Sequence, residues 1–187
     1  MTSLRLCAVL ASATLIASCA GLGPPVRAPA PFDLIGRVAV SYDGRAFSSS
    51  VRWHHLPDRD EIWLLTFAGQ TLAYIVSDSA GATLTGADRT QYSAPDVESL
   101  TRQGLGWDLP LTYLGWWVRG KAAPAPTAHD IKRDERARLI GFTQDDWHIT
   151  LVPDPRLENG LPRRLELVND RNVIRLVIDV WRPVEGP

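Results

Sequence analysis

Residues 108–120 of this 187-residue chain read DLPLTYLGWWVRG. In this stretch the apolar residues follow the spacing of a helix instead of the spacing of a strand. Leu111, Leu114 and Val118 recur at helical spacing, and Pro110 is suited to the first turn of a helix. The stretch therefore predicts a short helix that is apolar around much of its circumference. Such a helix must either be buried on several sides by the rest of the protein or cover another apolar surface.

A second helix is expected directly upstream. Ser93 followed three residues later by Asp96 resembles a capping box, and Gly104 is placed to end the helix. The middle of the chain is therefore predicted to be a helical pair.

On both sides of this pair, short apolar segments alternate with turns, and in several of them, such as 32–41, 47–53 and 173–181, apolar residues recur at every second position, which is typical of half-buried strands. The segment 62–67 is almost wholly apolar. Asp43-Gly44 marks a hairpin turn between the first two segments. Residues 121–130 are interpreted as a loose connection. The sequence predicts a mainly β protein with helices (α+β), of roughly nine to eleven antiparallel strands. The expected strands are 32–41, 47–53, 62–67, 71–76, 82–86, 90–92, 139–142, 147–152, 164–168 and 173–181.

Residues 1–18 have the pattern of a lipoprotein signal peptide. Arg5 precedes an apolar run that is much shorter than the ~20 residues needed to span a bilayer. The order Ile16-Ala17-Ser18-Cys19 is aliphatic, small, small, cysteine, as lipoprotein processing requires. We expect cleavage before Cys19 and acylation of its thiol. The alternative is an ordinary secretory signal cut near Ala17 to Ala20.

The expected location is the periplasmic face of the outer membrane of a Gram-negative bacterium, with the protein held there by its lipid. Ala20 follows the cysteine, and the absence of Asp at that position resembles lipoproteins sent to the outer membrane. Residues 19–31 are then the lipidated cysteine and a proline-rich tether, and residues 32–187 form one domain. Cys7 leaves with the signal and Cys19 carries lipid, so no disulfide is expected.

Composition and motifs argue against several functions. Lys and Arg number 20 against 21 Asp and Glu, a balance that disfavours nucleic acid as a partner. The motifs HExxH, CxxC, GxSxG, GxGxxG and the P-loop are absent from the sequence. His54 and His55 are neighbours in a predicted strand and face opposite ways, so they cannot share one metal. We expect no enzyme activity, metal or cofactor.

The helical stretch also resembles a known family. Leu109-Pro110-Leu111-x-x-Leu114-x-x-Trp117-Val118-x-Gly120 is similar to the signature of the LolB family of outer-membrane lipoprotein receptors. The resemblance extends from Phe32 to Trp181. The other matching features, in the same order, are the lipoprotein signal, Gly36-Arg37-Val38, Arg52-Trp53, Trp147 and Trp181.

The resemblance implies an open, incomplete antiparallel β-barrel whose concave face is lidded by helices around a hydrophobic cavity. In the family, that cavity accepts the acyl chains of lipoproteins from the periplasmic carrier LolA, and the protein inserts this cargo into the outer membrane. Neither nucleotide nor metal is used, and we expect a monomer. We expect one apolar face of each element to line the cavity: Val38, Val40, Phe47, Val51, Leu114, Trp117, Trp147, Leu176 and Ile178.

The family further implies a protruding loop with a hydrophobe at its tip, within a Pro-Leu-Gly sequence, that touches the bilayer. The matching positions are Phe67, Ala68 and Gly69, with Ala68 where Leu is usual. Our hypothesis is that Phe67 is the membrane-touching side chain. Alternatively, Phe67 is the last core residue of its strand.

Two other functions fit the same residues. One is a different lipid-binding envelope lipoprotein that does not work with the carrier. The other is a structural envelope scaffold lipoprotein, in which the seven Trp residues would fill a core instead of lining a cavity.

Overall fold

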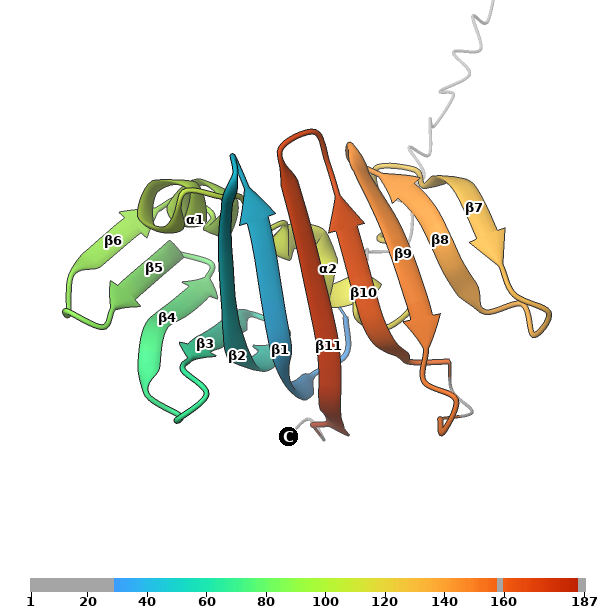
Figure 1. Cartoon of the computed structure of the whole chain (residues 1–187), viewed down its shortest axis with the longest axis horizontal. Helices are drawn as coiled ribbons and strands as arrows, with labels where there is room; N and C mark the ends of the chain where they lie inside the picture. The colour runs from blue at the N-terminus through green and yellow to red at the C-terminus, as the bar shows by residue number, and fades with distance from the viewer. Residues whose placement is uncertain (1–28, 158–159, 185–187) are drawn as a thin grey trace, which may run out of the picture.

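The computed structural model describes residues 29–157 and 160–184. The predicted signal peptide, Cys19 and tether residues 20–28 lie outside them. The described residues form one antiparallel sheet with two helices on its concave side (Figure 1). The elements are β1 (Phe32–Tyr42), β2 (Arg45–Leu56), β3 (Arg59–Leu65), β4 (Thr71–Asp78), β5 (Gly81–Gly86), β6 (Gln91–Ala94), α1 (Val97–Leu105), α2 (Leu111–Trp117), β7 (His129–Arg133), β8 (Leu139–Gln144), β9 (Trp147–Pro153), β10 (Pro162–Val168) and β11 (Asn172–Pro183).

The sheet is an open half-barrel. Its 11 strands lie in the order β6-β5-β4-β3-β2-β1-β11-β10-β9-β8-β7. Adjacent strands in the sheet are consecutive in the chain, except that β1 pairs with β11. The described edge strands β6 and β7 are not paired to each other, and the helical pair connects them along the chain. The expected open barrel lidded by helices is therefore confirmed.

The centre of the sheet is built from long strands whose residues alternate between two environments. In β1 the burial alternates along the strand, and the same period holds in β2 and β11. Asp43 and Gly44 form the predicted β1–β2 turn with positive φ values of 44° and 73°. A register shift at Ile35/Gly36 bends β1 where it pairs with β11. A Cβ on residue 36 would collide with the carbonyl oxygen of Val177, so the strands can approach this closely only at a glycine.

The helical pair forms as predicted, but its first helix has different ends. Asp96, and not Ser93, caps α1 by accepting a hydrogen bond from the Ser99 amide at 2.7 Å. Gly104 lies inside the helix, and Gly106 ends it in the left-handed conformation with a φ of 84°. Neither described helix is long and apolar enough to cross a bilayer.

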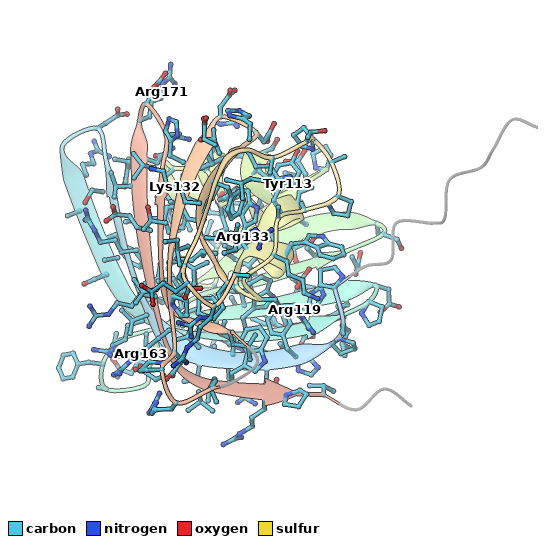
Figure 2. All side chains as sticks on the ribbon, turned by 90° about the vertical axis from the view of Figure 1, so that its right-hand side faces the viewer. Tyr113, Arg119, Lys132, Arg133, Arg163 and Arg171 are labelled. Atoms are coloured by element: carbon cyan, nitrogen blue, oxygen red, sulfur yellow. The ribbon has the colours of Figure 1, made fainter. Side chains whose placement is uncertain are left out.

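One strand was missed by the sequence patterns. Residues 121–130 were expected to be a loose connection, but β7 begins at His129. Every residue of β7 is exposed, so the strand has no apolar alternation to reveal it. Figure 2 views the molecule from this edge, with the sheet on one side and the helices on the other, and with Lys132 and Arg133 labelled on β7.

An apolar cavity as the candidate functional site

A narrow cavity lies between the concave face of the sheet and the helical segment. Its free volume is about 40 Å³, and every side chain that lines it is apolar. The sheet supplies the wall, while Trp107, Leu109 and Leu114 from the α1–α2 connection and α2 supply what we call the roof. The wall residues are Leu34, Val38, Val51, Trp53, Ile62, Leu64, Ile75, Leu167, Ile174 and Leu176.

Strand periodicity explains why the wall is apolar. Val38 and Leu176 are register partners across β1 and β11, and Leu34 and Trp53 are partners across β1 and β2. Because side chains alternate between the two faces of a strand, these residues all point to the concave side. The wall therefore offers only apolar contact, which suits an apolar ligand and provides no acid, base or nucleophile.

The structure brings four of the nine expected cavity residues together. Val38, Val51, Leu114 and Leu176 line the cavity. Five others lie elsewhere in the core or at its margin: Val40, Phe47, Trp117, Trp147 and Ile178.

Trp117 shows why spacing alone misplaces a side chain. Its ring is fully buried, but it packs edge-on against Phe142 at 6.3 Å and donates from Nε1 to Gln144. It thus anchors α2 to β8 and does not reach the cavity. Ile62, Leu64 and Ile75 lie in continuous apolar runs, so the sequence marks them as strand residues but does not show which of their neighbours face the cavity.

The roof is tied down at one end by a buried amide. Gln144 has no exposed surface, and its Oε1 accepts hydrogen bonds from Trp117 Nε1 at 2.8 Å and the Ala123 amide at 2.9 Å. Its Nε2 donates to the carbonyl oxygens of Ala123 and Pro126. The C-terminal end of α2 and the segment after it are therefore fixed to β8.

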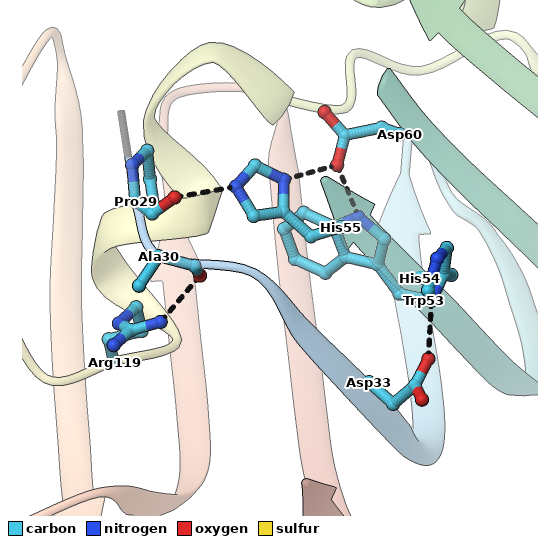
Figure 3. Close-up of polar contacts among 8 residues, drawn as sticks. All are labelled: Pro29, Ala30, Asp33, Trp53, His54, His55, Asp60 and Arg119. Carbon is cyan, nitrogen blue, oxygen red and sulfur yellow. Dashed lines mark hydrogen bonds and ion pairs between the residues drawn. The ribbon is translucent and has the colours of Figure 1, made fainter. Parts of the chain in front are cut away.

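Close to the opposite side of α2, polar contacts hold the first described residues of the chain (Figure 3). Asp60 accepts hydrogen bonds from Trp53 Nε1 at 2.6 Å and from His55 Nδ1 at 2.7 Å. His55 Nε2 lies 3.3 Å from the carbonyl oxygen of Pro29, and Arg119 donates to that of Ala30 at 2.7 Å. The end of the predicted tether is thus docked beside the roof.

The surroundings of this contact are aromatic. Phe32 stacks on His55 and on Trp181, with ring centroids 4.8 and 4.6 Å apart. Arg119 lies over the Trp181 ring, and burial lowers the pKa of its guanidinium. His54 points to the other face of β2 and bonds Asp33, so the two adjacent histidines face opposite ways as predicted.

The loop between β3 and β4 presents an apolar tip. β3 ends at Leu65, and Phe67 is fully exposed, so the alternative of Phe67 as the last core residue of its strand is wrong. The turn is closed by hydrogen bonds from the amides of Thr66 to the Gln70 carbonyl and of Gly69 to the Thr66 carbonyl. Gly69 has a φ of 84°, which keeps the turn tight beneath the exposed ring.

Among the residues that the structure describes, no group of three His, Cys, Asp or Glu side chains gathers closely enough to hold a metal ion. The described site is thus an apolar cavity, a roof fixed at one end and an exposed aromatic tip.

Comparisons with known proteins agree with this architecture. A family model described as "Outer membrane lipoprotein LolB" matches residues 30–181. The outer-membrane lipoprotein LolB of Chromobacterium violaceum is 35% identical over 182 residues, covering 93% of this chain and 97% of that protein. The LolB of Thiobacillus denitrificans is 33% identical over 184 residues, covering 95% and 97%. A crystal structure of a LolA superfamily protein from Nitrosomonas europaea shares the fold, with a TM-score of 0.51, 8% identity and coverage of 87% of this chain and 90% of that one.

Proposed function

Because the chain belongs to the LolB family of outer-membrane lipoproteins, we propose that it is a receptor that accepts acylated lipoproteins from the periplasmic carrier LolA and inserts them into the outer membrane without nucleotide. The observation that supports this most is the wholly apolar cavity under the helical roof.

The chemistry of the cargo explains why such a cavity is needed. An acyl chain of about 15 methylenes costs on the order of 12 kcal/mol to expose to water, at ~0.8 kcal/mol per methylene. Cargo must therefore pass directly from one apolar shelter to another. Without an energy source, the direction of transfer follows from affinities that increase from carrier to receptor to membrane.

The cavity must enlarge to hold an acyl chain. Its 40 Å³ is far below the roughly 300–1,000 Å³ of typical small-molecule sites. The wall belongs to a hydrogen-bonded sheet, and Gln144 fixes the C-terminal end of α2. We therefore assign the opening movement to α1 and the connection carrying Trp107 and Leu109, which would make room along Val38, Val51 and Leu176.

The anchor completes the proposal. Residues 1–18 are removed, Cys19 is acylated, residues 20–31 are the tether and residues 32–187 form the receptor domain, which acts as a monomer. Residues 19–28, upstream of the docked Pro29, span at most roughly 35 Å when extended. The domain is then held within one small-domain diameter of the membrane surface.

The first test is cargo transfer. The mature chain carrying Cys19→Ala is mixed with carrier that has been loaded with an acylated lipoprotein, and cargo is followed by size-exclusion chromatography. Cargo should move to the receptor domain, and an apolar fluorescent probe bound to the domain should be displaced. If cargo stayed on a carrier that releases it to an established LolB, the receptor function would be wrong.

The second test concerns the loop of Phe67, Ala68 and Gly69, which we propose touches the bilayer through the exposed Phe67 ring. Phe67→Glu should accept cargo from the carrier as the parent does but deliver it to liposomes several-fold more slowly, because a carboxylate resists burial in lipid. Gln70→Glu adds the same charge in the same loop and serves as the control. Equal delivery by both variants and the parent would remove the loop from the mechanism.

A further inference from the structure

Ser49 is a buried residue whose polar atom is left without a partner. It is 9% exposed, and its Oγ has no hydrogen-bond partner among the described residues. Most buried polar side-chain atoms in proteins are hydrogen-bonded, and an unpaired one lowers stability. The Ser49 hydroxyl is therefore free to form a hydrogen bond with a ligand that enters the protein.

The position of Ser49 places it at one end of the cavity. Phe47, Ser49 and Val51 are alternate residues of β2 and share its concave face, and Val51 lines the cavity. Ser49 is also the register partner of Val38, another wall residue. The hydroxyl thus lies one strand repeat beyond the apolar wall.

Side chains of β2 become more exposed from Ser49 towards the β1–β2 turn. Trp53 and Val51 are buried, Phe47 is half-buried and Arg45 is exposed. On β1, Tyr42 is half-buried, and a Cβ on Gly106 at the end of α1 would lie 3.2 Å from its ring. Ser49 therefore sits between a dry apolar wall and the outer end of the sheet, beside the part of the roof that we expect to move.

Resting on the receptor function proposed above, we propose that the Ser49 hydroxyl donates a hydrogen bond to the carbonyl oxygen of an acyl group of the cargo, either an ester or an amide. A methylene chain has no polar atom, so the carbonyl is the group that Ser49 can recognise. With the carbonyl at Ser49, the alkyl tail extends along Val38 and Val51 towards Trp53. The Ser49 hydroxyl would thus set how far each acyl chain extends into the cavity.

The test compares ligands that differ only at the carbonyl. Lipopeptides carrying a diacyl (ester) or a dialkyl (ether) glyceryl-cysteine of equal chain length are titrated into the mature Cys19→Ala chain against an apolar fluorescent probe. Ser49→Ala should lower the ratio of ester affinity to ether affinity roughly three- to tenfold, through the loss of one hydrogen bond. An N-acylated ether lipopeptide identifies the amide as the partner if it, and not the diester, loses affinity in Ser49→Ala.

Ser48→Ala and Ser50→Ala are matched controls, because these neighbours lie on the other face of β2 and should leave the ratio unchanged. Thermal unfolding of the empty proteins is the second readout. Ser49→Ala should unfold at the same or a higher temperature, since it removes an unpaired hydroxyl. Thr101→Val should unfold at a lower temperature, since the Thr101 hydroxyl bonds the Val97 carbonyl and the Leu109 amide.

Two results would overturn the assignment. If Ser49→Ala kept the parent's affinity for both the diester and the N-acylated ether lipopeptide, Ser49 would contact neither carbonyl, and the receptor function would be left standing. A lowered unfolding temperature like that of Thr101→Val would show that the hydroxyl already serves the empty fold. If the parent bound neither the ester nor the ether, the receptor function itself would fall, and the Ser49 assignment with it.

Discussion

Gln144 illustrates how a single polar residue organises an otherwise apolar region. It is the last residue of β8 and precedes the exposed Asp145-Asp146 turn, so its sequence context suggests a surface position. In the fold it is fully buried, and both atoms of its amide are used. The amide satisfies backbone groups of the segment after α2 that would otherwise be buried without partners.

We predict that Gln144→Leu lowers the free energy of unfolding by roughly 2–4 kcal/mol, because it leaves Trp117 Nε1 and the Ala123 amide unpaired. Urea denaturation followed by Trp fluorescence measures the change. Gln103→Leu on the exposed side of α1 is the control and should stay within about 0.5 kcal/mol of the parent. Equal stabilities of the two variants would contradict the anchoring role.

Asp154 gives a prediction about pH. Hydrogen bonds from the Arg156 guanidinium and backbone amide lower the pKa of its carboxyl to about 2. The folded value lies below the unfolded value of about 3.9, so the stabilisation is present above pH ~4 and is lost as the pH falls towards 2. Asp154→Asn should therefore be less stable than the parent at pH 7, and most of this deficit should be gone by pH 2.

Denaturant unfolding at both pH values measures this difference. Asp170→Asn, in the exposed turn before β11, is the control and should match the parent at each pH. A deficit in Asp154→Asn that persisted unchanged at pH 2 would show that shape, and not charge, explains the loss.

At the scale of elements, β1 is the strand on which the two halves of the sheet meet. It pairs with β2 on one side and with β11 on the other, so a defect in β1 affects both hairpins. The bulge at Gly36 lets β11 approach closely enough to keep this pairing. The glycine is needed for space, since its φ is not among the positive values of the chain.

We predict that Gly36→Ala destabilises the fold by more than about 3 kcal/mol or prevents folding, because the new Cβ meets backbone that cannot move without breaking the β1–β11 ladder. Gly44→Ala is the matched control. Its site is open and only its positive φ is unfavourable, so the cost should be about 1 kcal/mol. Circular dichroism checks whether each variant folds, and urea titration measures its free energy of unfolding. Similar losses of stability in the two variants would refute the steric argument.

The edge strand β7 has features that hinder pairing with a strand of another molecule. All five of its residues are exposed, and its pairing with β8 is irregular at two places. Lys132 and Arg133 stand on this free edge, and Asp130 has a positive φ of 52°. Charges and bulges of this kind hinder the addition of a strand from another molecule. An open half-barrel needs that protection because its edges do not close on each other.

At the scale of the whole molecule, the fold combines a rigid wall with a roof fixed at one end. The sheet is continuous through β1, β2 and β11, while α1 packs against the short strands β5 and β6, of which β6 is an edge strand. The docked Pro29 and Ala30 lie on the side of α2, next to the roof. Opening at α1 would leave both the sheet and this docking site in place.

We predict that an acylated lipopeptide changes amide hydrogen exchange in residues 97–110 and leaves the amides of β1, β2 and β11 unchanged. The reason is that the roof must move to make room, while the sheet already forms the wall. Mass spectrometry of the mature Cys19→Ala chain measures the change, and the same peptide without acyl chains is the control. Altered exchange in the sheet with an unchanged roof would place the opening elsewhere.

The sequence predicts the strand pattern on both sides of a helical pair, the β1–β2 turn at Asp43-Gly44 and the opposite directions of His54 and His55, because these depend on local periodicity and turn chemistry. It missed β7, whose exposed residues carry no such pattern. The folded chain was needed to show which apolar residues face the cavity, why Trp117 does not, that Gln144 is buried and that the Ser49 hydroxyl is unpaired. These features depend on which strands, distant in the chain, curve beneath the roof. Contacts between residues far apart in the chain cannot be read from the local spacing of apolar residues.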